Sequence, residues 1–319
     1  RKLLILPPFF MRPLDYIIRS VPFLKGFTGT TINYDRDVLN LYDKYPPQLS
    51  FTQEEEVRGS SGLAEIGIPA GARFVCLIVR DGRYLNPDND SSSSELKNTY
   101  RNSSIQTYAL AAEQLAALGY YVLRMGALVE QPLITNNPMI IDYAANGMRT
   151  DFMDIYLGAN CTFCISTGTG FDAIPNIFRL PIVFVNYSPI EYFFTSRKEY
   201  LSITRHYFSK LLNRELTLSE ILKEGIGIFD SSLNLEQSGV RLIENTSEEI
   251  VAVVMEMAQR IDGTWKPGPD DERLQNKFWD IFKKYSRYIK ADSLGIPIHG
   301  EIHEVFGAAF LRQNPQWLD

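Results

Sequence analysis

The chain of 319 residues is predicted to adopt an α/β fold, a Rossmann-like parallel sheet with flanking helices. Two observations support this prediction. Apolar runs typical of strands buried on both faces alternate with helical segments, which is the pattern of βαβ units. One such run leads through the glycine-rich turn Ile165 to Pro175 (ISTGTGFDAIP) into a helix, as phosphate-binding turns do. Right-handed crossovers between these units predict a doubly wound sheet.

Residues 1–70 form an N-terminal segment without a firm strand. Thr52 and Glu55 have the spacing of a capping box, which predicts the start of a short helix. The first residues, RKLLILPPFFMRP, carry a basic pair and an apolar run, but the run is too short for a secretory signal and no cleavage site follows. We expect this start to be the interior of a longer natural chain, or a short strand leading into a loop.

Residues 71–240 contain the predicted sheet. Its first strand is Arg73–Arg80, a nearly unbroken apolar run, and a long polar loop with the serines Ser91–Ser94 follows. Loops of this length inside a compact domain are usually functional or mobile. The other predicted elements are a helix at 105–118 closed by Gly119, strands at 120–125, 162–166 and 182–185, helices at 151–157 and 171–178, and an edge strand at 226–229.

Residues 241–319 are predicted to be helical and to pack back on the sheet. The segment 245–261 is amphipathic and has Thr246 as its cap, with Glu249 three residues later. The segment 270–288 is a second amphipathic helix by the same spacing of apolar residues.

Composition excludes several classes of function. The formal net charge is −6, and no cluster of Lys and Arg interleaves with aromatic residues, so no nucleic-acid partner is expected. A membrane-spanning helix needs roughly 18 consecutive apolar residues, and the sequence has no such run.

The cysteines and histidines are interpreted as structural. Cys161 and Cys164 form a C-x-x-C pair within an apolar strand, where residues three apart face opposite sides. With Cys76, they are expected to be core thiols in a reducing compartment. His299 and His303 lie four residues apart, but a proline and a glycine disfavour a helix there, so no metal site is expected.

The turn after the third predicted strand is the sharpest candidate site. Phosphate binds where backbone N–H groups and a helix N-terminus meet, glycines allow close approach, and hydroxyls add hydrogen bonds. The turn is neither a P-loop nor a dinucleotide fingerprint, because no Lys follows its second glycine and Ala173 replaces the last glycine. A tight turn without a ligand is the alternative. The expected phosphate-binding residues are Ser166, Thr167, Gly168, Thr169 and Gly170.

Polar residues at the ends of two other strands complete the candidate site, because the carboxyl ends of parallel strands face the ligand crevice. Arg80 and Asp81 follow the first strand, where a cation can balance a diphosphate and a carboxylate can act as a base. A surface Arg–Asp pair is the alternative. Arg124 and Gly126 end the second strand, and we expect them to bind phosphate, with a structural ion pair as the alternative.

Four further residues and a second-rank set lie beside the same crevice. Arg101 and Asn102 precede a helix, where they either bind an anion or cap the helix. Asn186 and Tyr187 end the strand after the phosphate turn, where the tyrosine either stacks on a base or ribose or packs in the core. The second-rank candidates are Asp142, Arg149, Asp151, Asp172 and Glu191.

The chain resembles the glycosyltransferases of bacterial surface-polysaccharide loci, which look like the GT-B class. The resemblance lies in the ordered motifs VRDGRYL, YRN, YYVLRMG and DIYLGANCTFCISTGTGFDAIPNIFRLPIVFVNYSP, and it extends from about Asp35 to about Tyr207. A GT-B enzyme has two Rossmann-like domains, and the C-terminal one holds the nucleotide-sugar donor. By this likeness, residues 1–70 are a short or truncated remnant of the acceptor domain.

The resemblance implies metal-independent transfer of a sugar from a nucleotide-diphosphate sugar to a hydroxyl of a surface glycan. The turn Ser166 to Gly170 would hold the donor diphosphate, Arg80 and Arg124 would balance the leaving group, and Asp81 would be the base. The donor is a substrate, so no resident cofactor is expected. The implied place of action is the bacterial cytoplasm, with a peripheral association at the inner face of the membrane.

Two other functions also fit the sequence. One is a nucleotide-sugar epimerase of the same fold, which would need crevice carboxylates such as Asp142 or Glu191. The other is a non-catalytic nucleotide-binding module.

Overall fold

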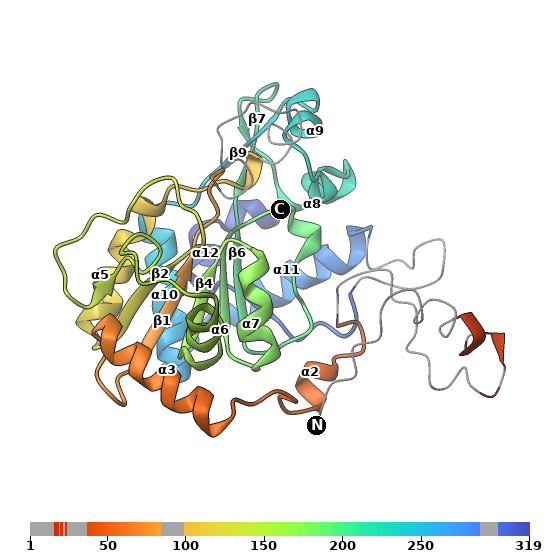
Figure 1. The fold of residues 1–319 in the computed structure, drawn as a ribbon. Helices are drawn as coiled ribbons and strands as arrows, with labels where there is room; N and C mark the ends of the chain where they lie inside the picture. The colour runs from red at the N-terminus through yellow and green to blue at the C-terminus, as the bar shows by residue number, and fades with distance from the viewer. Residues whose placement is uncertain (1–15, 19, 22, 24–36, 84–98, 288–298) are drawn as a thin grey trace. The chain divides into compact units, whose positions relative to one another are not determined.

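The computed structural model describes residues 16–18, 20, 21, 23, 37–83, 99–287 and 299–319. The chain divides into two compact units, Arg1–Arg36 and Asp37–Asp319. In the first unit, the described residues 16–18 and 20 are helical. All elements named below belong to the second unit (Figure 1). The predictions for the first 13 residues and for Ser91–Ser94 fall outside the described residues.

Within the described residues, seven parallel strands form the central sheet, in the order β10-β6-β5-β4-β1-β2-β3. Apart from β10, this is the 3-2-1-4-5-6 order of doubly wound dinucleotide-binding sheets. The predicted Rossmann-like parallel sheet with flanking helices is therefore confirmed. Its strands are β1 (Phe74–Ile78), β2 (Tyr121–Met125), β3 (Ile140–Ile141), β4 (Phe163–Ser166), β5 (Ile182–Tyr187), β6 (Tyr200–Thr204) and β10 (Val305–Phe306).

The strand order reverses at β1. On one side β1 pairs with β2, and on the other it pairs with β4 with Cys76 opposite Cys164. These two cysteines and Cys161 are unbridged and buried, as the apolar pattern predicts. Because successive strands are added in opposite directions from this point, the carboxyl ends of β1 and β4 flank the position where open α/β sheets bind ligands.

Two groups of helices cover the two faces of the sheet (Figure 1). On one face α5 packs against α10, and on the other α6 packs against α3 and α7. The two 3-10 segments η3 and η4 lead directly into α5 and α7. The bounds are α3 (Gln53–Ile66), η3 (Ile105–Tyr108), α5 (Ala109–Ala117), α6 (Asp151–Asn160), η4 (Gly170–Asp172), α7 (Ala173–Ile177) and α10 (Ser247–Ile261).

The predicted helix caps are present. Thr52 caps α3 in a capping box with Glu55, and Thr246 caps α10 in a box with Glu249. Each box satisfies backbone N–H groups that the first helical turn leaves unpaired. The helix expected at 105–118 ends before Gly119, which adopts a left-handed φ of 85°.

An aromatic cluster joins the C-terminal elements. It includes Phe278 of α11 (Asp271–Tyr285) and Phe306 of β10, whose ring centroids lie 4.2 Å apart. The predicted second amphipathic helix is therefore present as α11. The other C-terminal elements are α12 (Ala308–Gln313) and η7 (Pro315–Leu318), and both contact α11. No helix in the described part of the chain is long and apolar enough to cross a bilayer.

A small antiparallel sheet, in the order β8-β7-β9, follows the carboxyl end of β6. Beside it, residues 226–228 form a 3-10 helix, so the edge strand expected at 226–229 is wrong. The preceding Gly225 has a left-handed φ of 71°, and this turn leaves no extended run in which a strand can pair. The bounds are β7 (His206–Ser209), β8 (Arg214–Glu215), β9 (Val240–Ile243), α8 (Leu218–Lys223), η6 (Ile226–Ile228) and α9 (Ser232–Gln237).

The remaining short elements connect these layers. They are α2 (Leu41–Lys44), η2 (Thr99–Arg101) and η5 (Ile190–Tyr192).

His206 links the small sheet to α10 and gives the fold a pH dependence. Its Nε2 lies 3.0 Å from Glu249 and its Nδ1 lies 3.2 Å from Glu215. Burial alone lowers the pKa of His206, but the hydrogen bonds and negative charges of Glu249 and Glu215 outweigh burial and raise that pKa. The stabilisation by protonated His206 is therefore complete below the pKa of the unfolded chain and is lost as the pH rises through the raised pKa.

We expect the free energy of unfolding to fall by up to about 1 kcal/mol because of this residue as the pH rises from roughly 6 through its raised pKa. Urea titrations across this range should show a shallower pH dependence for His206→Gln than for the unmodified chain. Equal slopes in the two proteins would contradict the assignment.

Candidate functional site

A cavity of about 340 Å³ opens at the carboxyl ends of β1 and β2 and beside the turn after β4. We call it the turn cavity. It lies where the strand order reverses, and its walls are partly apolar, as in most small-molecule sites. It is lined by Ile78, Val79, Arg80, Asp81, Met125, Gly126, Ala127, Leu128, Val129, Asp154, Thr169, Gly170 and Phe171.

Arg80 brings a positive charge to the turn cavity that no carboxylate among the described residues pairs with. Its backbone N–H donates to Thr167 Oγ1 (2.9 Å) and its carbonyl accepts from the Ser103 N–H (2.9 Å), which fix the end of β1. The guanidinium Nε is buried without a hydrogen-bond partner, and no carboxylate among the described residues pairs with this side chain. Burial lowers the pKa of Arg80, and the nearby charge of Arg101 lowers it further. An anion in the cavity would stabilise the charged form of Arg80 and so offset both the burial of this charge and its repulsion by Arg101.

The turn itself uses most of its polar groups internally. Ser166 Oγ accepts from the Gly168 N–H (3.0 Å), and Asp172 Oδ2 accepts from the Thr169 N–H (2.6 Å). Within the described part of the chain, the amides of Gly170 and Phe171 make no hydrogen bond, as is usual for the first residues of a helix. These two amides, rather than the whole turn, are the donors that the structure offers to a ligand.

The helix after the turn is short, and a second arginine lies against the turn. Residues 170–177 form one 3-10 turn followed by five α-helical residues, so their dipole is small. Arg101 Nη2 donates a hydrogen bond to the Gly168 carbonyl. Asp172 is buried beneath the turn, and burial raises its pKa to about 6 although hydrogen bonds from Ser166 and Thr169 oppose this shift. Through its hydrogen bond to the Gly168 carbonyl, Arg101 stabilises the turn, and its charge lies close to that of Arg80.

Arg124, expected to bind phosphate or to form a structural ion pair, is fully buried. It lies at the end of β2 between two carboxylates, with Nη1 3.4 Å from Asp142 Oδ1 and Nη2 3.7 Å from Asp81 Oδ2. The contacts of Arg124 with Asp81 and Asp142 are therefore those of a structural ion pair, the alternative to phosphate binding. Gly126 follows with a φ of 152° and lines the turn cavity.

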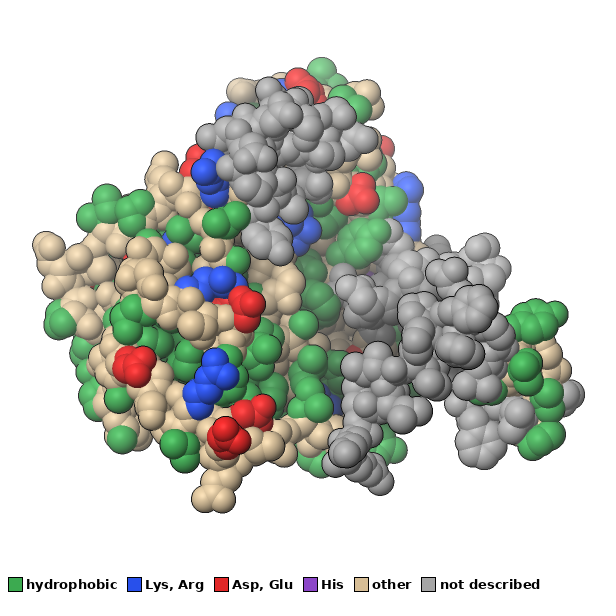
Figure 2. All heavy atoms as spheres, viewed as in Figure 1, with side chains coloured by type: hydrophobic (Ala, Val, Ile, Leu, Met, Phe, Trp, Pro, Cys, Tyr) green, Lys and Arg blue, Asp and Glu red, His purple; other side chains and the backbone are tan. Residues whose placement is uncertain are grey.

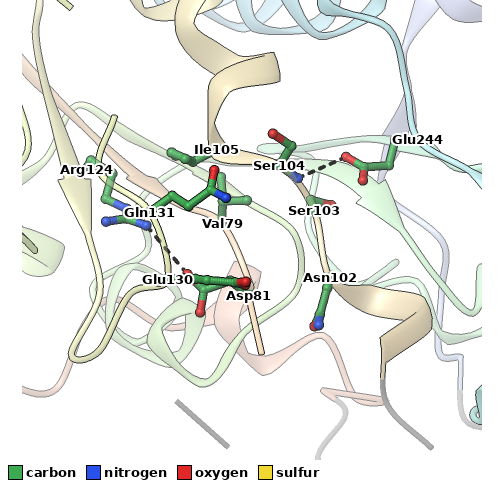
Figure 3. Close-up of a pocket in the computed structure, with 10 residues that line it drawn as sticks. All are labelled: Val79, Asp81, Asn102, Ser103, Ser104, Ile105, Arg124, Glu130, Gln131 and Glu244. Atoms are coloured by element: carbon green, nitrogen blue, oxygen red, sulfur yellow. Dashed lines mark hydrogen bonds and ion pairs between the residues drawn. The ribbon is translucent and has the colours of Figure 1, made fainter. Parts of the chain in front are cut away.

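Asp81 stands between two cavities. The second cavity, of about 270 Å³, lies on the other side of Val79 and Asp81 and is lined by further carboxylates (Figure 3). We call it the acidic cavity. Asp81 accepts hydrogen bonds from the N–H groups of Arg83 (3.0 Å) and Glu130 (2.9 Å), which hold its carboxylate in place. Asn102, expected beside an anion, also lines the acidic cavity.

Asn186 and Tyr187 are not brought to either cavity. The Asn186 side chain is 1% exposed; it donates to Tyr108 Oη (2.9 Å) and accepts from the Asn245 N–H (2.6 Å). The Tyr187 hydroxyl donates to the Tyr192 carbonyl (2.8 Å), and its ring lies against Gly168. The packing alternative describes both residues, and Tyr187 shapes the turn from behind.

Two carboxylates of the second-rank set, Asp142 and Glu191, also form hydrogen bonds or ion pairs within the protein. Asp142 accepts from the Leu133 N–H (2.7 Å) in addition to facing Arg124. Glu191 is fully buried and accepts from Ser286 Oγ (2.8 Å). Neither lines the turn cavity or the acidic cavity.

Asp154 is a cavity residue that the sequence reasoning missed. It lies on α6, where Arg149 Nη2 is 2.7 Å from its Oδ2, and burial raises its pKa although Arg149 opposes the shift. Asp151, which the sequence suggested instead, has a side chain that is 92% exposed. Residues three apart lie on the same side of a helix, so the spacing alone does not distinguish Asp154 from Asp151.

Charges on the visible face are mixed, with Lys and Arg side chains interspersed with Asp and Glu (Figure 2). Among the described residues, no group of three or more His, Cys, Asp or Glu side chains is arranged to hold a metal ion. Comparisons with protein-family models, curated proteins and solved structures find no match to this chain.

The two glycines of the turn should differ in what they contribute to stability. Gly168 has a φ of 80°, and an added Cβ would lie 3.0 Å from the Tyr187 ring, whereas a Cβ on Gly170 would meet no atom within 4 Å. We expect Gly168→Ala to lower the free energy of unfolding by about 1–2 kcal/mol. The matched variant Gly170→Ala should leave it unchanged or raise it by up to about 1 kcal/mol.

Denaturant unfolding of both variants checks this difference. Equal stabilities would show that Gly168 does not need the left-handed conformation.

Proposed function

We propose that this protein is a glycosyltransferase that moves a sugar from a nucleotide-diphosphate donor to a hydroxyl group of a glycan acceptor. The observation that carries the proposal is the Arg80 guanidinium, whose buried Nε has no hydrogen-bond partner, in a cavity at the switch point of a Rossmann-like sheet that is also lined by Gly170 and Phe171. A diphosphate needs a cation and N–H donors on one wall, and this cavity offers both.

The donor would lie with its diphosphate in the turn cavity. Arg80 would bind the phosphate oxygens directly, and Arg101 would add positive charge from behind the turn. Arg124, which the sequence analysis placed on the leaving group, takes a different role in this proposal. It holds Asp81 in the crevice, because its Nη2 faces that carboxylate.

The transfer step would take place beside Asp81. The acceptor oxygen forms a bond to the anomeric carbon while its proton passes to the Asp81 carboxylate. The bond from the anomeric carbon to the diphosphate breaks, and its electron pair stays on the leaving phosphate oxygen. The charge of the departing diphosphate is then balanced by Arg80 and by the two amides, without any requirement for a metal in this scheme.

The likeness to GT-B enzymes supports this proposal, with one difference. GT-B enzymes have two Rossmann-like domains, whereas the described residues of this chain contain one parallel sheet. The cytoplasmic face of the bacterial membrane, where surface glycans are assembled, is the proposed place of action. An epimerase is less well supported, because Asp142 and Glu191 are engaged in structural contacts outside the cavities.

Substitution of Arg80 tests the donor site. Arg80→Ala should weaken the binding of a nucleoside diphosphate by about tenfold or more, since a charge-assisted hydrogen bond is lost. Arg73→Ala is the matched control: Arg73 lies just before the other end of β1, in a surface ion pair with Asp262. Calorimetric titration with ADP, CDP, GDP and UDP gives the affinities. If none of the four binds the unmodified protein, or if Arg80→Ala binds as tightly as Arg73→Ala, the proposal fails.

Substitution of Asp81 tests the base. With the nucleotide sugar that binding identifies, Asp81→Asn should reduce the rate of sugar transfer by about 10²- to 10⁴-fold and leave nucleotide affinity within a few-fold of normal. Unchanged transfer by a folded Asp81→Asn protein would assign the base to another residue, and Asp154 is then the next carboxylate to substitute.

A further inference from the structure

The acidic cavity lies between the start of η3 and the loop after β2, and polar side chains from several segments surround it (Figure 3). Its volume is about 270 Å³. It shares Val79 and Asp81 with the turn cavity, so the two spaces meet at the proposed base. The lining residues are Val79, Asp81, Asn102, Ser103, Ser104, Ile105, Arg124, Glu130, Gln131 and Glu244.

The charges of this cavity disfavour a second phosphate. The lining residues include three carboxylates, on Asp81, Glu130 and Glu244, and one guanidinium, on Arg124, while Arg205 lies behind Asn102 and Ser103 and is hydrogen-bonded to both. The helix start beside the cavity is already occupied by a carboxylate of the protein, because the Ser104 N–H donates to Glu244 Oε2 (3.2 Å). An anionic ligand would therefore meet like charges and no open helix end.

Arg124 also has hydrogen-bonding capacity that the described residues do not fill. Its side chain is 0% exposed, its Nε has no hydrogen-bond partner, and its Nη2 makes no hydrogen bond besides the 3.7 Å ion pair with Asp81. A buried donor without a partner is costly, so such a group at the wall of a cavity indicates a ligand that supplies an acceptor.

Three more polar side chains at the cavity are available to a ligand. Among the described residues, the side chains of Asn102, Glu130 and Gln131 have no hydrogen-bond or ion-pair partner. Figure 3 shows them arranged around the same space as Arg124 and Asp81. The ligand that fits must both accept from amides and a guanidinium and donate to carboxylates. Adjacent hydroxyl groups on a sugar ring do both, because each hydroxyl is a donor and an acceptor.

We propose that the acidic cavity binds an uncharged sugar ring, the one that carries the acceptor hydroxyl. This inference rests on the proposed function, and it specifies the acceptor as a neutral sugar rather than a phosphate or a phosphorylated sugar. With the donor diphosphate in the turn cavity, the two substrates meet at Asp81, which lines both spaces. The acceptor hydroxyl then lies beside the carboxylate that takes its proton.

Saturation-transfer NMR with the full chain tests this proposal. The probes are glucose, galactose, mannose and N-acetylglucosamine, each compared with glucose 6-phosphate. We expect at least one neutral sugar to bind, and to bind more tightly than the phosphorylated one. The variants Asn102→Ala and Gln131→Ala should weaken that binding by about fivefold or more, since each loses hydrogen bonds to the hydroxyls.

Gln114→Ala is the matched control, because Gln114 is an exposed residue of α5 that lines neither cavity. It should bind the neutral sugar as the unmodified protein does. Melting temperatures of all three variants confirm that they are folded. Binding of none of the four neutral sugars, a preference for glucose 6-phosphate, or equal binding by Gln131→Ala and Gln114→Ala would each overturn the proposal.

Titration of the same samples with nucleoside diphosphate separates this inference from the proposed function. If the diphosphate binds through Arg80 but no sugar binds, the acceptor cavity is wrong and the donor site stands. If a neutral sugar binds through Gln131 but no diphosphate binds, the sugar cavity stands and the donor assignment is wrong.

Discussion

The strand order of the central sheet reverses at β1, and both cavities are lined by residues at the end of this strand. Because β2 is added on one side of β1 and β4 on the other, the chain leaves their carboxyl ends in opposite directions. In doubly wound sheets the crossover connections lead away from this point and leave a crevice above the strand ends, which polar residues that follow the strands can face. Arg80 and the turn before η4 are at this place for that reason. The two cavities open at the same edge and share the residues Val79 and Asp81.

A network of buried charges stabilises the loops at the carboxyl ends of the strands. Arg124 is enclosed by Asp81 and Asp142, and Arg205 donates to the Ser103 hydroxyl and to the Asn102 carbonyl. Burying a guanidinium is unfavourable unless carboxylates and hydrogen-bond acceptors surround it. The loops that carry these acceptors are therefore tied to the sheet. Asp81 has two roles, because its carboxylate belongs both to this network and to the proposed site of transfer.

The sequence predicted those elements that can be recognised from the residues of one segment alone. It did not predict elements whose residues are buried through contacts with segments far away in the sequence. Strands β1, β2, β4 and β5 are near-continuous apolar runs, and α10 carries its own capping box, so each could be recognised alone. Strand β6 could not, because its buried Ser202 and Thr204 are polar and are satisfied by Glu304 and Tyr187 from other parts of the chain. The same limit applies to the site. The position of Arg80 followed from the strand end, whereas the enclosure of Arg124 by Asp142 depends on the pairing of β2 with the short strand β3, which Asp142 follows.

We propose that a nucleotide diphosphate binds at the switch point, between Arg80 and the amides of Gly170 and Phe171. A crystal structure of the full chain with the tightest-binding nucleoside diphosphate would locate the phosphates. We expect phosphate oxygens within hydrogen-bonding distance of the Arg80 guanidinium and of at least one of these two amides. A diphosphate bound at the amino ends of the strands, or in the acidic cavity beside Glu130 and Glu244, would contradict it.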